Sequence, residues 1–287
     1  MDELEVLVQY EKRRIFIDIA YKGCGSGCLY CYSTSASDKQ DLISLYDVDR
    51  ICESILKKLD DSIFYIISFC PNTEPFKSDE SCDLVIKIIK KLVHKRVAFQ
   101  IATKEIIPLN VLATLNELSR FKNQIFINIS MPYLETKVIE PYAGTCEERI
   151  KNIRNIKDFP NLSSCLYIKP YNSLVEKNLD KYMKLVREKR PDFVCIGMKF
   201  EGKSASNDMC RTMYNREIAE KTISKNNLDG LFKIKEDLEK EGVLVYLSST
   251  CIIVNCLKIE CEHELYKYKS EICQKCAIRR MSDEGEY

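Results

Sequence analysis

Three cysteines near the start of the chain have a spacing that suits a metal cluster. Cys24, Cys28 and Cys31 stand in the segment YKGCGSGCLYCY with the pattern C-x3-C-x2-C. Thiolates are strong iron–sulfur ligands, and a cubane [4Fe–4S] cluster normally takes four of them. Three thiolates therefore leave one iron with an open coordination position, where a small molecule can bind the metal directly, as at catalytic zinc sites. The glycines between the cysteines let the backbone turn closely around such a cluster.

A structural zinc loop and a chance cluster of buried cysteines are the alternatives for this segment. Zinc sites usually use paired C-x2-C spacings and four ligands, often with histidine. The whole chain contains only two histidines, His94 and His263. The spacing and the strand that precedes it favour the iron–sulfur interpretation over both alternatives.

A second group of cysteines lies at the end of the chain, where five fall within 26 residues. Their spacing is C-x4-C-x4-C-x11-C-x2-C, and they are Cys251, Cys256, Cys261, Cys273 and Cys276. Clustered cysteines in a cytosolic chain more often bind metal than form disulfides. We expect a second metal centre here, first an auxiliary iron–sulfur cluster, then zinc with or without His263, and an unligated tail as the remaining alternative. One thiol is spare, and Cys251 is the candidate for an unligated residue or a hydrogen donor.

Short apolar runs alternate with segments of helical periodicity, a pattern typical of βαβ units and a parallel sheet. The expected strands are Arg14–Ala20, Ile63–Phe69, Val97–Thr103, Gln124–Ser130, Cys165–Lys169, Phe193–Gly197 and, as a further strand, Val243–Leu247. The expected helices are Asp47–Leu59, Ser81–Val93, Val111–Leu118, Glu147–Ile156, Leu179–Val186 and a long helix over Tyr214–Lys240, broken near Asn226–Gly230.

This alternation predicts an α/β fold, a partial (β/α)6 TIM-type barrel over residues 1–248. The cysteine-rich C-terminal extension, residues 249–287, follows it and is expected to hold the auxiliary metal site. Functional sites in such barrels lie at the carboxyl ends of the strands. The cysteine loop after the first strand and the polar residues after the later strands should therefore surround one mouth.

The cysteine loop resembles the signature loop of radical S-adenosylmethionine (SAM) enzymes in its spacing, in its place after the first strand, and in the aromatic Tyr30 before the last cysteine. In that family the amino and carboxylate groups of SAM chelate the unique iron. An electron from the cluster then cleaves SAM to methionine and a 5′-deoxyadenosyl radical, which abstracts hydrogen from a substrate or adds to it. The resemblance implies a lyase- or transferase-type enzyme with [4Fe–4S] and SAM as cofactors, and an electron donor such as flavodoxin or ferredoxin.

Later strand ends are similar to those of the spore photoproduct lyase-like branch of the family. Where radical SAM proteins often have a Gly-Gly-Glu-like segment, this chain lacks the glycines and has Asn-Thr-Glu-Pro at 72–75. The resemblance implies that Glu74 accepts the SAM ammonium, that Lys104 binds its carboxylate, and that Arg149 is a SAM-binding cation. The full set of expected cofactor-binding residues is Tyr30, Ser68, Thr73, Glu74, Lys104, Ser130, Arg149 and Lys169.

Structural interpretations stand beside two of these roles. The segment around Glu74 also reads as a turn bounded by proline. Arg149 also reads as a solvated helix arginine beside Glu147 and Glu148. Lys169 belongs to a Lys-Pro-Tyr-Asn segment that resembles the strand end bordering the substrate in this branch.

The amino-acid composition argues against some classes of binding partner but does not identify the substrate. The chain carries 44 basic and 43 acidic residues, a net charge of +1, which gives no electrostatic support for nucleic acid or an anionic membrane. The N-terminal segment lacks the apolar region of a signal peptide, and no apolar run is long enough for a membrane span, so we expect a cytoplasmic protein. Nucleic acid or nucleotide, peptide and small metabolite remain the substrate alternatives. A non-catalytic iron–sulfur or zinc protein that binds or senses is the alternative function.

The cysteine-rich tail generates the first testable prediction. A Cys24/Cys28/Cys31→Ala triple variant removes the first cluster, so any remaining metal belongs to the tail. Metal analysis should find about two to four irons per chain, given the two usual cluster sizes. About one zinc without iron would replace the cluster with the zinc alternative, and absence of both metals would contradict a second metal centre.

Overall fold

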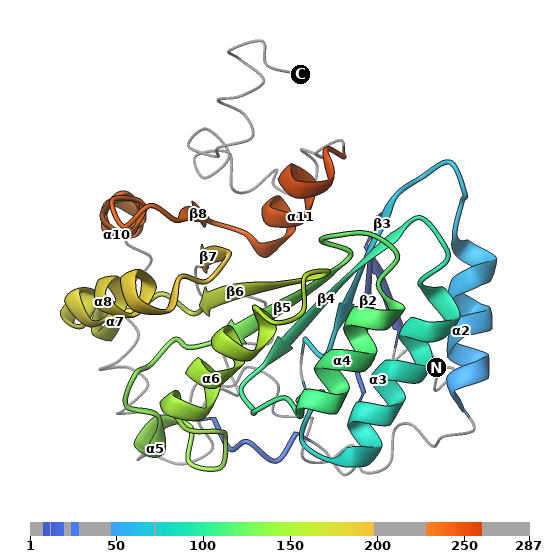
Figure 1. Cartoon of the computed structure of the whole chain (residues 1–287), viewed down its shortest axis with the longest axis horizontal. Coiled ribbons are helices and arrows are strands. Elements are labelled where there is room, and N and C mark those ends of the chain that lie inside the picture. Colours follow the sequence, from blue (N-terminus) through green and yellow to red (C-terminus); the bar gives the residue numbers. More distant parts are fainter. Residues whose placement is uncertain are drawn as a thin grey trace, which may run out of the picture.

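The protein is described here from a computed structural model, which defines residues 8–11, 13–19, 24–28, 47–71, 73–197 and 228–259. Within these residues the chain forms one eight-stranded sheet whose strands follow chain order (Figure 1). β1 (Val8–Glu11) pairs antiparallel with β2 (Arg14–Ile17), and every later pair is parallel. The later strands are β3 (Tyr65–Phe69), β4 (Val97–Thr103), β5 (Ile125–Ser130), β6 (Leu162–Ile168), β7 (Phe193–Ile196) and β8 (Leu244–Tyr246).

Helices connect the parallel strands, as short crossover connections require. They are α2 (Asp47–Lys58), α3 (Asp79–Leu92), α4 (Leu109–Leu118), α5 (Thr136–Ile139), α6 (Cys146–Ile156), α7 (Ser173–Lys177), α8 (Leu179–Lys189), α10 (Leu228–Glu239) and α11 (Ser249–Leu257). α3 and α6 each begin with a capping box, which fixes where the chain enters the helix.

The sheet has two buried faces because successive side chains of a strand point to opposite sides. In β4, Phe99 and Ile101 pack in the large core beneath the connecting helices, whereas Ala98 belongs to a second core. This second core joins one face of β3 to β8 to the apolar side of α11. α11 therefore covers the inner face of the sheet, on the other side from α3, α4 and α6 (Figure 1).

The predicted α/β architecture is confirmed, and each predicted strand has its counterpart in the sheet. The sheet is open rather than closed, since β1 and β8 each pair with one neighbour only among the described residues. The parallel part contains seven strands, including the further strand at Leu244–Tyr246, and β1 was not predicted. Of the expected long helix over Tyr214–Lys240, the structure describes the part that forms α10.

α11, the first helix of the predicted tail, packs against the sheet. Ile252 and Ile253 of α11 are fully buried against the inner face of the sheet. We therefore propose that the compact unit extends to about Ile259, beyond the predicted boundary at residue 248. No helix within the described ranges is long and apolar enough to cross a membrane.

Packing of α11 leads to a stability prediction. Ile253→Ala should lower the free energy of unfolding by about 2–5 kcal/mol, because it leaves a cavity between α11 and the sheet. Leu109→Ala, at a side chain that is 59% exposed, is the matched control and should change stability little. Denaturant unfolding of both variants measures the difference. Equal effects would show that α11 is not part of the cooperative unit.

Candidate active site

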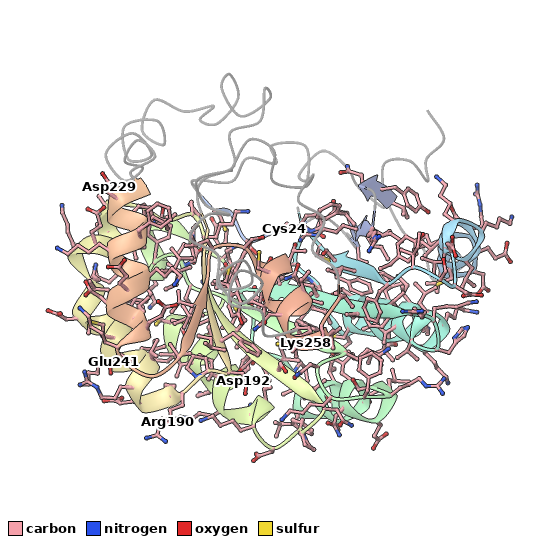
Figure 2. The ribbon with its side chains drawn as sticks, turned by 90° about the horizontal axis from the view of Figure 1, so that it is seen from above. Cys24, Arg190, Asp192, Asp229, Glu241 and Lys258 are labelled. Atoms are coloured by element: carbon pink, nitrogen blue, oxygen red, sulfur yellow. The ribbon has the colours of Figure 1, made fainter. Side chains whose placement is uncertain are left out.

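Polar and charged side chains gather where the parallel strands end. Glu74 follows β3, and the Thr103–Lys104 pair ends β4. The described part of the cysteine loop, residues 24–28, follows β2. Cys24 is well separated from Asp192, which precedes β7 at the amino ends of the strands (Figure 2). These positions agree with the carboxyl-end location of sites in barrels of this kind.

The Glu74 carboxylate links the ends of β3 and β4. Its Oε1 accepts hydrogen bonds from Thr103 Oγ1 at 2.5 Å and from Phe76 N at 3.3 Å, and its Oε2 accepts one from Lys104 N at 2.8 Å. Burial raises the pKa of this carboxyl, although the hydrogen bonds from Thr103 and Lys104 oppose the shift. The carboxylate is thus held in one orientation, and a cation beside it would favour its charged form.

Lys104 connects this carboxylate to the cysteine loop. Burial alone would lower the pKa of its ammonium, but the negative charges of Cys28, Glu140, Glu74 and Cys24 outweigh burial and raise it. Because charge interactions weaken with distance, the groups named lie near the Lys104 ammonium. The same environment raises the pKa of Tyr133, first through burial and then through Glu140 and Cys28.

The cysteine loop lies against the segment that follows β5. Tyr142 N donates a hydrogen bond to Ser26 O at 3.3 Å, and a Cβ at Gly27 would lie 2.7 Å from the Tyr142 ring. Gly27 also has a φ of +62°, which favours glycine. The Cys24 thiol points toward Ser26, with Sγ 3.4 Å from its hydroxyl oxygen. Two thiols, Cys24 and Cys28, are thereby presented half-buried beside Lys104.

The segment after β5 is held by a fully buried ion pair. Arg149 Nη1 lies 2.7 Å from Glu140 Oε2, and both side chains are 0% exposed. Arg149 also donates to Gly144 O and Ser130 O, each at 2.8 Å. Within the described residues its Nη2 has no hydrogen-bond partner. The guanidinium is thus fully buried among protein groups, so the solvated helix arginine is wrong, whereas its role as a SAM-binding cation stays a prediction.

The other predicted cofactor-binding residues that the structure describes lie in two places, at the strand ends and along the inner face of the sheet. Thr73 donates to Ile19 O at 2.7 Å at the strand ends, and the backbone of Ser130 accepts from Arg149. Ser68 lies lower, hydrogen-bonded to Arg14 on the inner face of the sheet, and Lys169 follows β6 beside that face. Tyr30 lies outside the described residues.

Of the predicted metal ligands, Cys31, Cys261, Cys273 and Cys276 also lie outside the described residues. Among the described residues, no group of three or more side chains suited to hold a metal occurs. Cys251 is buried in the second core, and Cys256 is half-buried further along α11. Cys256 packs against the same second core, so the two thiols of α11 differ in burial rather than in the cluster that they contact.

Sequence reasoning missed Tyr133, which lies near Cys28, and the polar residues in the middle of the strands. Gln100 and Asn128 each interrupt an otherwise apolar run of their strand, and Arg14 begins β2. A polar residue in a strand that is buried on both faces is itself a signal, because it must find a partner or line a site.

Comparison with known proteins gives structural relatives only. No protein-family model and no curated protein matches the chain. Among solved structures, native anSMEcpe with bound AdoMet matches with a TM-score of 0.54 at 15% identity, covering 86% of this chain and 67% of that one. A spore photoproduct lyase mutant with bound AdoMet and dinucleoside spore photoproduct matches with a TM-score of 0.59 at 14% identity, covering 82% and 76%. Streptococcus suis SuiB bound to S-adenosylmethionine matches with a TM-score of 0.56 at 14% identity, covering 90% and 55%.

The fold is that of radical SAM enzymes. The radical SAM fold explains why the cysteine loop after β2 and the strand ends that carry Glu74 and Lys104 lie at the same edge of the sheet. The donor set also fits a cluster of that kind, since Cys24 and Cys28 are free, half-buried thiols and Cys31 follows three positions later in the sequence.

The buried ion pair generates a prediction that separates a positioning role from SAM binding. Arg149→Met should destabilise the protein by about 3–5 kcal/mol, because it leaves Glu140 buried without its counter-charge. Arg187→Met removes an ion pair with Glu241 from a side chain that is 66% exposed, and should lower stability far less, because solvent screens the pair. Thermal or denaturant unfolding without SAM measures both. A similar small loss in both variants would contradict the positioning role.

Proposed function

We propose that this chain is a radical SAM enzyme whose [4Fe–4S] cluster is held by Cys24, Cys28 and Cys31. The observation that carries the proposal is the convergence of Cys28, Lys104 and Glu74 at one edge of a sheet with the radical SAM fold. When bound, the cluster supplies the electron that cleaves SAM and so generates the 5′-deoxyadenosyl radical.

Glu74 is suited to receive the ammonium group of SAM. Its carboxylate is fixed by Thr103 and by the backbone N–H of Lys104, which leaves little conformational entropy to be lost on binding. Burial without a fully compensating cation raises its pKa, so an arriving ammonium would stabilise the charged form. Thr73 stands beside it on the same edge and belongs to the same proposed site.

Lys104 and Arg149 take different roles in the proposal. The Lys104 ammonium lies among the cysteine thiols and two carboxylates, where it would bind the SAM carboxylate as a point charge. Arg149 acts at a distance, because it holds Glu140 and Gly144 in place beneath the site. The hydroxyl of Ser130 and the aromatic ring of Tyr30 complete the predicted set.

The reaction also needs an electron donor, and we propose flavodoxin or ferredoxin for it. The proposed reaction is of the lyase or transferase type.

For the tail, a second metal centre is proposed on Cys256, Cys261, Cys273 and Cys276. The burial of Cys251 among the apolar residues of α11 supports its assignment as the spare thiol. A non-catalytic iron–sulfur or zinc protein remains the second candidate.

Reductive cleavage of SAM tests the proposed function. Reconstituted protein with dithionite should convert SAM to 5′-deoxyadenosine and methionine, measured by chromatography, while the Cys24/Cys28/Cys31→Ala variant should form neither. A Cys52→Ala variant, which removes a buried thiol of α2, is the matched control and should retain cleavage. Wild-type protein that carries the cluster and yet leaves SAM intact would favour the non-catalytic candidate.

The role of Glu74 gives a separate prediction on SAM affinity. Glu74→Gln should weaken SAM binding by about 1.5–3 kcal/mol, the range for a hydrogen bond to a charged group, because the amide no longer attracts the ammonium. Glu117→Gln changes an exposed carboxylate on α4 and should leave the affinity unchanged. Equilibrium binding of SAM to both reconstituted variants is the measurement. An unchanged affinity in Glu74→Gln would remove this residue from the site.

A further inference from the structure

The inner face of the sheet carries a layer of polar side chains between α11 and the strand ends. Gln100 and Asn128 are each two residues beyond a member of the second core, Ala98 and Phe126, and so lie on the same face. Hydrogen bonds extend the layer to β2 and β3, because Arg14 Nε donates to Ser68 Oγ at 3.0 Å and Arg14 Nη2 donates to Gln100 Oε1 at 2.9 Å.

The two cations of this layer come from strands that are far apart in the sheet. Arg14 belongs to β2, where its guanidinium also lies 4.4 Å from the centre of the Phe16 ring. Lys169 directly follows β6. Its ammonium and the Arg14 guanidinium are close enough for their like charges to interact.

Lys169 is held in place by the neighbouring strand. A Cβ at Gly197, just after β7, would lie 2.7 Å from Lys169 Cδ and 2.9 Å from its Cγ. Gly197 therefore leaves the space that the lysine stem occupies. Burial lowers the pKa of the ammonium, and Arg14 lowers it further, while Cys195 opposes the shift. Among the described residues, no carboxylate forms an ion pair with Lys169.

The two amides of the layer have unused hydrogen-bonding capacity. Gln100 is 3% exposed and Asn128 is 2% exposed. Neither Gln100 Nε2 nor Asn128 Oδ1 has a hydrogen-bond partner within the part of the chain that the structure describes. Buried polar atoms in native proteins are usually paired with protein, water or ligand. An unpaired amide donor beside two cations suits an oxyanion.

We propose that the inner face of the sheet binds an anionic group of the substrate, a carboxylate or a phosphate, through Arg14, Lys169 and Gln100. The identification of this ligand as the substrate rests on the proposed function, whereas the anion site itself does not. Gln100 lies three residues before Thr103 on β4, roughly 10 Å below the end of that strand at the usual strand rise, whereas Lys169 stands at the carboxyl end of β6. That separation suits a small molecule with its acidic group inside the barrel and its reacting atom toward SAM.

Anion binding to the full-length protein, as purified and without added SAM, tests this inference. The probes are inorganic phosphate and acetate, titrated at constant ionic strength with chloride as the reference, and the readout is the thermal unfolding temperature together with calorimetric binding. Wild-type protein should show saturable binding of at least one probe. A response to phosphate alone points to a phosphorylated substrate, and a response to acetate alone points to a carboxylic acid.

Three variants locate the binding. Lys169→Met keeps the length of the stem, removes the half-buried ammonium without a cavity, and should weaken anion binding roughly tenfold or more, the scale of a lost charge-assisted hydrogen bond. Gly197→Ala should also weaken it, because the added methyl group displaces the lysine stem. Lys184→Met, on the exposed side of α8, is the matched control and should bind as wild type does.

Absence of any response beyond chloride in wild-type protein would overturn the inference. Binding by Lys169→Met as tight as that of wild type would also overturn it. Saturable binding that Lys169→Met and Gly197→Ala lose and Lys184→Met keeps supports it. Because the titration needs neither cluster nor SAM, a protein that binds anions but leaves SAM intact would contradict the proposed function alone, and a protein that cleaves SAM but binds neither anion would contradict this inference alone.

Discussion

The fully buried ion pair between Arg149 and Glu140 is the interaction on which the geometry of the site depends. Arg149 ties Glu140, Gly144 and the end of β5 together from within the interior. The segment that it fixes carries Tyr142, which lies over Gly27 of the cysteine loop. Glu140 in turn is one of the charges that raise the pKa of Lys104. A chain of opposite charges thus runs from the core to the thiols, and removal of one member would leave the next buried without compensation.

The two faces of the sheet differ in their side chains and in their roles. The outer face is apolar and packs against the connecting helices, so it supplies stability and fixes the strand register. The inner face changes along the strands, from the apolar contact with α11, through the layer of Arg14 and Gln100, to the carboxylate of Glu74 at the end. Buried charge therefore lies where a polar ligand can compensate for it. The remainder of the inner face is apolar and excludes water.

Sequence patterns predicted local features well and pairings between distant residues poorly. The strands were recognisable because apolar runs of strand length are flanked by turn residues, and the cysteine loop because its spacing is itself the signal. The solvated alternative for Arg149 is wrong because its neighbours in sequence are Glu147 and Glu148, whereas its partner Glu140 approaches only after the segment folds back. The hydrogen bonds of Arg14 with Ser68 and Gln100 could not be predicted because the three residues come from three different strands. The packing of Cys251–Val254 on the sheet was not predicted because the helix that contains this run carries two cysteines of the C-terminal group.

The central claim is that the cysteine loop and the strand ends with Glu74 and Lys104 form a single site for a cluster and SAM. Electron paramagnetic resonance of the reduced, reconstituted protein with and without SAM tests it most directly, because a ligand on the open iron changes the electronic environment of the cluster. The account predicts that SAM shifts the signal of wild-type protein and that Lys104→Ala requires a higher SAM concentration for the same shift. A cluster signal that stays the same at a SAM concentration shown independently to saturate the protein would contradict it.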